Sequence, residues 1–317
     1  MQYGTIPGID KPVARVVQGL AGLTTQNTDF WFPVMDSVVE LGGNMFDLGH
    51  VYGNGECERA FGLWLKERGN RDQIIVQTKG AHHNADRQRV TPFDITADIH
   101  DSLARLKVEH IDLYILHRDD ESQPVGPIVE VLNQHNQAGK IGAFGGSNWS
   151  AARIQAANDY AKANGLLPFV IGSNNFSLAP QIKEPWARCV SISNNEAELA
   201  FYRKTQLPLL PWSSLAGGFF SGRFRRDNLD TFTEYLDKLC VECYCSEENF
   251  ERLDRAEKMA AEKGVTVTQI AMAFIANQGI NLFALTQARN QQEFEASIAA
   301  RDMQLTQSEA DWLNLKR

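Results

Sequence analysis

Several familiar sequence signatures are missing from the 317-residue chain. No segment reads G-x-G-x-x-G after a strand, which is the fingerprint of a doubly wound dinucleotide-binding fold, and no P-loop is present. The nearest approach begins at Gly53 and lacks the third glycine. Any dinucleotide that the chain binds must therefore be held in another way.

Long apolar runs and stretches of positive charge are also missing. No run approaches the ~20 apolar residues of a membrane helix, and the first residues lack the basic and apolar regions of a secretory signal. The net charge of −8 argues against a general binder of nucleic acid or acidic membranes. We therefore expect a cytoplasmic protein with neither nucleic acid nor membrane as a partner.

Cysteine is scarce, with five residues that do not suggest a disulfide framework in a chain of this size. Cys240, Cys243 and Cys245 lie close together, but no second pair stands at the spacing of a zinc site. We expect reduced thiols in a long loop and no bound metal.

An alternation of short β-type runs with longer helical stretches organises what is present. Strand alternating with helix predicts βα units and a parallel sheet. Eight such strands without an obvious linker favour a closed barrel, so the predicted fold class is a single-domain (β/α)8 TIM barrel over residues 1–317. The expected strands are Ala14–Gln18, Asn44–Asp47, Gln73–Lys79, Ile111–His117, Ile141–Ser147, Pro168–Gly172, Leu207–Trp212 and Asn281–Thr286.

Two segments depart from this alternation. Residues 213–247 are too long for a simple connection between strand and helix, and long connections are usually functional loops or disordered. We expect this loop to lie over the C-terminal face of the barrel. Residues 308–316 predict an extra terminal helix.

Ionisable residues stand at the ends of three consecutive predicted strands. These are Asp47, Lys79 and His117, and a barrel brings the C-terminal ends of its strands to one mouth. A low-dielectric pocket there can shift their pKa values. Tyr52 follows in a glycine-bounded loop that can carry its ring over the same mouth.

With these residues in place, the chain resembles the aldo-keto reductase family, of the bacterial type with a long loop after strand 7. The resemblance covers essentially the whole chain and implies reversible NAD(P)H-dependent reduction of an aldehyde or ketone. It rests on Asn44–Gly53, on Lys79 at a strand end, and on Ile111–His117, Gly146–Trp149 and Leu215–Gly222, which match in order and spacing.

The resemblance implies a catalytic tetrad of Asp47, Tyr52, Lys79 and His117. In it, Tyr52 donates the proton to the carbonyl oxygen as hydride arrives from nicotinamide. Tyrosine ordinarily titrates near about 10, and we expect the Lys79 ammonium to lower that pKa. Asp47 would keep Lys79 charged, and His117 would orient and polarise the carbonyl.

Cofactor residues also follow from the resemblance. Ser147 and Asn148 match the pair that binds the nicotinamide carboxamide, and Ser173 stands where the family usually has Gln. Trp212 takes the place of the aromatic that stacks on nicotinamide, often Tyr. The segment that wraps the pyrophosphate is matched by Ser213, Leu215, Gly217, Gly218 and Arg223.

The adenosine end would meet Gln287 and Arg289. A guanidinium can grip a 2′-phosphate, which favours NADP(H), with NAD(H) as the alternative. Against this, Ala296 and Ser297 replace the Glu-Asn pair that often holds adenine, and Glu293 adds a negative charge.

Candidate substrate contacts are His82, Arg118 and Trp149. Polar groups beside aromatic faces suit a sugar or sugar-derived carbonyl, so the expected partner is a small carbonyl or alcohol, whereas the oligomeric state is not readable. Two alternatives stay open. Lys79 could form a Schiff base in a lyase, or the chain could be a non-enzymatic, cofactor-binding and redox-sensing subunit.

Overall fold

The computed structural model describes residues 1–316 and divides into two units. Parallel strands form the centre of the first unit. This unit contains Met1–Ser173 and Gln287–Gln291. Its parallel strands pair in chain order, so each neighbour in sequence is a neighbour in the sheet. They are β3 (Val16–Gly19), β4 (Met45–Asp47), β5 (Ile75–Gly80), β6 (Ile111–Leu116), β7 (Ile141–Ser147) and β8 (Gly172–Ser173).

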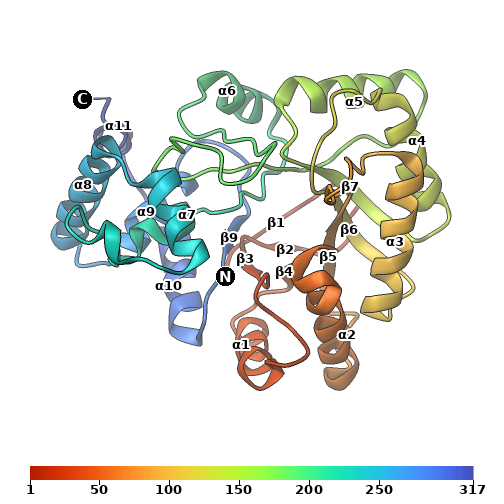
Figure 1. Cartoon of the computed structure of the whole chain (residues 1–317), viewed down its shortest axis with the longest axis horizontal. Coiled ribbons are helices and arrows are strands. Elements are labelled where there is room, and N and C mark those ends of the chain that lie inside the picture. The colour runs from red at the N-terminus through yellow and green to blue at the C-terminus, as the bar shows by residue number, and fades with distance from the viewer. Residues whose placement is uncertain (317) are drawn as a thin grey trace. The chain divides into compact units, whose positions relative to one another are not determined.

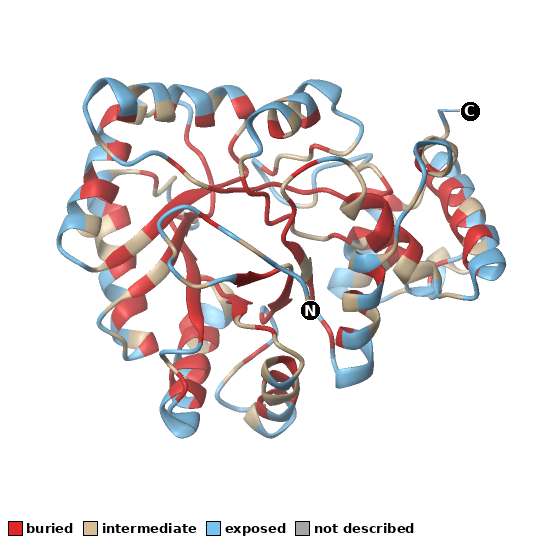
Figure 2. Ribbon diagram, turned by 180° about the vertical axis from the view of Figure 1, so that it is seen from behind, coloured by how far each residue is buried: buried red, intermediate tan, exposed pale blue. Residues whose placement is uncertain are grey.

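Helices connect these strands and cover the outside of the sheet (Figure 1). A small antiparallel pair of strands, β1 (Tyr3–Gly4) and β2 (Val13–Ala14), precedes the parallel strands in the chain. The strands are buried along most of their length, and each helix turns one face to solvent (Figure 2). The helices are α1 (Thr28–Glu40), α2 (Glu56–Arg68), α3 (Pro92–Leu106), α4 (Val125–Gln137) and α5 (Ala151–Ala163).

Local sequence signals explain where α3 lies and how it packs. Thr91 caps its first turn by accepting a hydrogen bond from the Asp94 backbone N–H, and Pro92 occupies the first helical position. Ile95, Ile99 and other residues at helical spacing are buried on one face. The helix is thus held firmly against the sheet from its first turn.

Side chains alternate across β5 in the manner of a strand. Lys79 points to the side where Asp47 lies, and its neighbour Thr78 points to Glu58 of α2. The strand thus links a polar cluster at its C-terminal end with the helices behind it.

The second unit contains Asn174–Thr286 and the chain from Gln292 onward. Its apolar core joins Phe219 and Phe220 to buried residues of α8 and α9. Its elements are α6 (Glu196–Thr205), η2 (Ala216–Ser221), η3 (Leu229–Thr231), α7 (Tyr235–Tyr244), α8 (Glu247–Lys263), α9 (Val267–Ala276), β9 (Ala284–Thr286), α10 (Gln291–Asp302) and α11 (Gln307–Leu313).

Three predicted strands are clearly shorter than expected. The strand predicted over Asn281–Thr286 is β9, which covers only Ala284–Thr286. Of residues 207–212, only Leu209 and Trp212 form isolated bridges, because Pro208 and Pro211 supply no N–H to a ladder. Of residues 168–172, only Gly172 belongs to a strand, β8.

The segment from 213 to 247 is not a simple loop. It contains η2, η3 and α7, and Cys240 and Cys243 are buried on α7, so the expectation of thiols in a long loop was wrong. All five cysteines are free thiols. The terminal helix runs over Gln307–Leu313, whereas the position of residues 213–247 over the barrel and the single-domain boundary stay predictions.

Within residues 1–316, no helix is both long and apolar enough to cross a membrane. The same residues contain no group of three or more His, Cys, Asp or Glu side chains arranged to hold a metal ion.

Candidate active site

Asp47 and Lys79 form a buried ion pair at the C-terminal ends of β4 and β5. The Lys79 Nζ donates to Asp47 Oδ1 at 2.5 Å and Oδ2 at 2.6 Å, and it also donates to the Leu48 carbonyl at 3.2 Å. Only 2% of Lys79 is exposed. Such a pair is stable when additional hydrogen bonds satisfy the ammonium, as they do here.

Tyr52 completes this arrangement from the loop after β4. It begins the short helix η1 (Tyr52–Gly55), and its hydroxyl lies 3.0 Å from the Lys79 Nζ. Lys79 also lies 4.9 Å from the centre of the Tyr52 ring. The ammonium therefore contacts both the Asp47 carboxylate, which stabilises its positive charge, and the Tyr52 phenol, whose proton transfer it can assist.

Burial raises the pKa of Tyr52 above the ordinary tyrosine value, and the opposing charge of Lys79 does not overcome it. Asp47 raises the same pKa. Lys79 thus acts in the predicted direction, but the expected lowering of the Tyr52 pKa was wrong, because desolvation of the phenolate outweighs the ammonium. The phenol is held in its protonated form.

The Lys79 ammonium is held charged. Burial by itself would lower the pKa of Lys79, but the neighbouring Asp47 carboxylate and Tyr52 together raise it above the ordinary lysine value. A Schiff base requires a neutral amine, so this environment disfavours Lys79 as a nucleophile.

His117 follows β6 directly and faces Tyr52 edge to face, with 5.6 Å between ring centres. It is 8% exposed, and its Nδ1 has no hydrogen-bond partner among residues 1–316. Burial, and then the positive charges of Lys79 and Arg118, hold its pKa well below the ordinary histidine value. The ring is a neutral imidazole with an unused polar atom beside the phenol.

The predicted carboxamide residues lie at the ends of β7 and β8 in the same unit. The Ser147 hydroxyl donates to the Ser173 carbonyl at 2.6 Å, and the Asn148 Nδ2 donates to the Ser147 hydroxyl at 3.2 Å and to the His117 carbonyl at 3.1 Å. The Ser173 hydroxyl is fully buried and has no partner among residues 1–316. That orphaned hydroxyl fits a ligand with a polar group such as a carboxamide.

Other predicted cofactor residues lie in the second unit. Trp212 and Ser213 are partly exposed, and the backbone at Gly217 and Gly218 has positive φ angles of 64° and 97°. Arg223 is exposed and pairs with Asp237 at 2.5 Å, so a phosphate would have to replace that carboxylate. Leu215 precedes η2 and is half-buried.

Gln287 and Arg289 belong to the first unit, and both are exposed at its surface. Exposure allows a phosphate to reach Arg289, which already has an interaction within the chain.

The three predicted substrate residues differ in accessibility. His82 is half-buried beside His117, with 4.9 Å between ring centres, and burial lowers its pKa to about 4. Arg118 is buried and donates to the His117 carbonyl at 2.9 Å. Trp149 is fully buried and donates from Nε1 to the Arg118 carbonyl at 3.1 Å, so it supports Arg118 from behind.

An ion pair that was not predicted joins α2 to α3. Glu58 of α2 is completely buried, and Arg105 of α3 lies 3.2 Å from its carboxylate. The available signal was a charged residue among the apolar positions Cys57, Phe61 and Leu65 of one helix.

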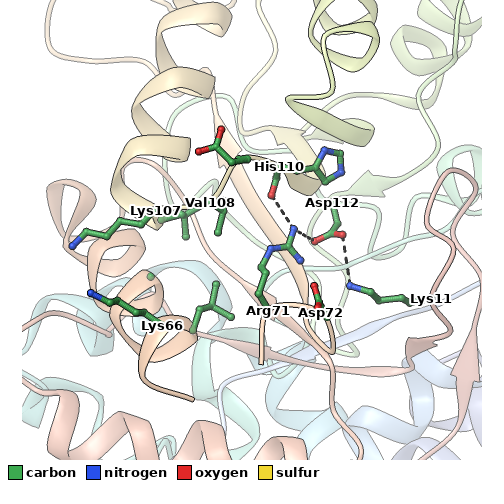
Figure 3. A pocket seen from close by; sticks show the side chains of 12 residues that line it. Lys11, Lys66, Arg71, Asp72, Lys107, Val108, His110 and Asp112 are labelled. Carbon is green, nitrogen blue, oxygen red and sulfur yellow. Dashed lines mark hydrogen bonds and ion pairs between the residues drawn. The ribbon is translucent and has the colours of Figure 1, made fainter. Parts of the chain in front are cut away.

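A cavity of about 610 Å³ lies at the opposite ends of these strands (Figure 3). Arg71 on its wall forms an ion pair with Asp112 at 2.8 Å and donates hydrogen bonds to the carbonyls of Ile74 and His110 at 3.1 and 2.8 Å. Lys66 lies apart from this pair in the view. Residues at the N-terminal ends of barrel strands usually serve stability, and none of the four tetrad residues lines this cavity.

Comparison with known proteins places these residues in a family. Residues 15–315 match the model described as the Aldo/keto reductase family. The chain is 25% identical over 314 residues to the NADP(+) aryl-alcohol dehydrogenase of Phanerodontia chrysosporium, covering 92% of this chain and 77% of that protein. It is 26% identical over 306 residues to norsolorinic acid reductase of Aspergillus flavus, covering 92% and 72%.

A solved structure is similar over nearly the whole chain. The glycerol dehydrogenase of Gluconobacter oxydans matches with a TM-score of 0.79 and 25% sequence identity, covering 98% of this chain and 94% of that one. This likeness and the family match confirm the predicted (β/α)8 fold class.

Proposed function

This chain belongs to the aldo/keto reductase family, and from that membership we propose that it reversibly reduces an aldehyde or ketone to the alcohol with NADP(H), Tyr52 donating the proton. The observation that carries the proposal is the Lys79 Nζ, which contacts both carboxylate oxygens of Asp47 and the Tyr52 hydroxyl. The protonated phenol is the form that a reduction requires.

Each tetrad residue has a distinct task. A nicotinamide, when bound, would supply hydride to the carbonyl carbon, so that negative charge would develop on the oxygen. Tyr52 gives its proton to that oxygen, and the Lys79 ammonium stabilises the phenolate left behind. Asp47 keeps Lys79 charged, while the neutral His117 donates a hydrogen bond that orients the carbonyl.

The residues present fit a nicotinamide dinucleotide. The orphaned Ser173 hydroxyl, with Ser147 and Asn148, would hold the carboxamide. The exposed Arg289 supports NADP(H) over NAD(H) through a 2′-phosphate. A relative is itself named for NADP(+), which agrees with this preference.

Two substrate classes have support. The half-buried neutral His82 beside His117 offers a polar contact for a hydroxylated, sugar-derived carbonyl. Relatives named aryl-alcohol dehydrogenase support an aromatic aldehyde as the second candidate. The charged Lys79 argues against the Schiff-base alternative, and turnover itself would exclude a purely non-enzymatic subunit.

A panel of carbonyl compounds tests the proposal. NADPH consumption is measured with sugars, keto-sugars, glyceraldehyde, aromatic aldehydes and steroid-like ketones, and repeated with NADH. We expect turnover with at least one class and a higher kcat/KM for NADPH than for NADH. Turnover of no class, together with tight cofactor binding, would support a cofactor-binding subunit instead.

Arg289 provides the control for cofactor choice. Arg289→Ala should weaken NADPH binding about tenfold, because the 2′-phosphate loses its guanidinium partner. NADH has no 2′-phosphate, so its binding should stay unchanged. Equal weakening of both cofactors would contradict the role of Arg289 in the preference.

A further inference from the structure

We propose that the ion pair between the half-buried Arg105 and the buried Glu58 positions Tyr52 for proton transfer. The proposal rests on the proposed function, because it concerns the placement of the same proton donor. Neither residue contacts the Tyr52 hydroxyl in the hydrogen bonds described, so their role is to position and not to react.

Arg105 supports the Tyr52 loop on both sides of the tyrosine. Its Nη1 donates to the His50 carbonyl at 3.0 Å, two residues before Tyr52. Three residues after Tyr52, Gly55 has a φ of 88°, and a Cβ added there would lie only 2.7–2.8 Å from the guanidinium. The guanidinium thus fills the space under the loop where only glycine fits.

Glu58 connects this loop to the strand that carries Lys79. Its Oε2 lies 3.2 Å from Arg105 Nη1, and its Oε1 accepts a hydrogen bond from the Thr78 hydroxyl at 2.7 Å. Thr78 directly precedes Lys79 on β5. One carboxylate therefore ties the support of Tyr52 to the backbone position of its ammonium partner.

The backbone of the loop joins the same strand. The His50 N–H donates to the Lys79 carbonyl at 2.7 Å. The His50 side chain reaches α3 as well, with Asp101 at 3.2 Å and Asp98 at 3.7 Å. These contacts fix the loop relative to β5 and α3, and Arg105 is the one that bears on both of its ends.

We expect that a variant of Arg105 with weaker contacts to the loop mainly changes the distance between the Tyr52 hydroxyl and the Lys79 Nζ, which is 3.0 Å here. A misplacement of about 1 Å can cost ~100-fold in rate. The Lys79 charge lowers the pKa of Tyr52, so a phenol that moves away from Lys79 should have a higher pKa. Cofactor binding, which depends on other strand ends, should not respond.

A double-mutant cycle tests the proposal in the full-length enzyme with NADPH and whichever aldehyde it turns over. Arg105→Lys and Gly55→Ala should each lower the single-turnover rate about tenfold, with an unchanged Kd for NADPH. In a Tyr52→Phe background, the same changes should lower the remaining rate less than twofold. The oxidation limb of the pH–rate profile should move to higher pH in Arg105→Lys.

Arg71→Lys is the matched control. Arg71 also pairs with a carboxylate and donates to two backbone carbonyls, but at the opposite ends of the strands. Its variant should lose stability and keep the single-turnover rate. Should Arg105→Lys fail to fold, Gly55→Ala still decides, because it disturbs the same contact between the guanidinium and the loop from the other side.

Equal losses from Arg105→Lys with and without Tyr52 would overturn the proposal, because the pair would then act only through general stability. A Tyr52→Phe enzyme as fast as wild type would instead sink the proposed function. The two failures are therefore distinguishable.

Discussion

At the scale of single residues, the chemistry depends on how burial and charge compete at Tyr52. Lys79 alone would make this phenol more acidic, whereas burial makes it less so, and burial prevails. The result suits a proton donor in reduction, since the acid form is present at neutral pH.

The direction of the Tyr52 pKa shift sets a pH dependence. Reduction needs the protonated phenol, so its rate should stay constant through neutral pH and fall only above the ordinary tyrosine range near about 10. Oxidation needs the phenolate, so its rate should rise with pH over the whole range. Profiles of kcat in both directions check this, and a reduction rate that falls with a pKa near neutrality would contradict it.

Removing Lys79 should damage both catalysis and stability. Lys79→Met leaves the buried Asp47 carboxylate unpaired, which should lower the free energy of unfolding by about 3–5 kcal/mol. The double variant Asp47→Asn/Lys79→Met buries no lone charge and should recover part of that loss. Urea unfolding measures stability, and a double variant less stable than Lys79→Met would count against this explanation.

Much of the candidate site could be predicted because it lies at strand ends. Asp47, Lys79 and His117 each end a β-type run, and the parallel topology brings them together. The net shift at Tyr52 was missed because desolvation depends on neighbours that are distant in sequence. The burial of Trp149 was missed for the same reason.

At the scale of elements, the approach of α2 to α3 determines where Tyr52 rests. Gly62 lies one turn after Glu58 on α2, and a Cβ added there would lie 2.4 Å from the Leu106 carbonyl of α3. The two helices can pack this closely only because Gly62 has no side chain. That packing places Glu58 within reach of Arg105.

Gly62→Ala should therefore affect stability and rate together. The added methyl group must push α2 from α3, which we expect to cost about 1–3 kcal/mol of unfolding free energy. The Glu58–Arg105 contact should weaken, so kcat should fall while the Kd for NADPH holds. Gly69→Ala, at the end of the same helix where a Cβ meets nothing within 4 Å, tests the loss from backbone strain alone.

Helical spacing predicts helices over residues 57–68 and 151–164, and the structure has α2 over Glu56–Arg68 and α5 over Ala151–Ala163. The helices α6 and α7 were missed. In α6 only Leu199 and Tyr202 are buried, so its apolar periodicity is weak. The strand expected over 207–212 overestimated the pairing, since the prolines there cannot donate to a ladder.

At the scale of the whole molecule, the fold class followed from the alternation of strands and helices, and the family match and the structural neighbour confirm it. The expected position of residues 213–247 over the C-terminal face stays a prediction, because no periodic pattern fixes where a long connection lies. Substrate identity is equally unspecified, since it depends on a few side chains at the mouth of a shared fold.

The central claim, that Tyr52 donates the proton, is tested most directly by single-turnover oxidation of bound NADPH. Wild type and Tyr52→Phe are mixed with a reactive aldehyde, and NADPH fluorescence follows the chemical step. We predict a rate at least about 100-fold lower in Tyr52→Phe, with the same Kd for NADPH. Equal single-turnover rates in the two proteins would contradict the account.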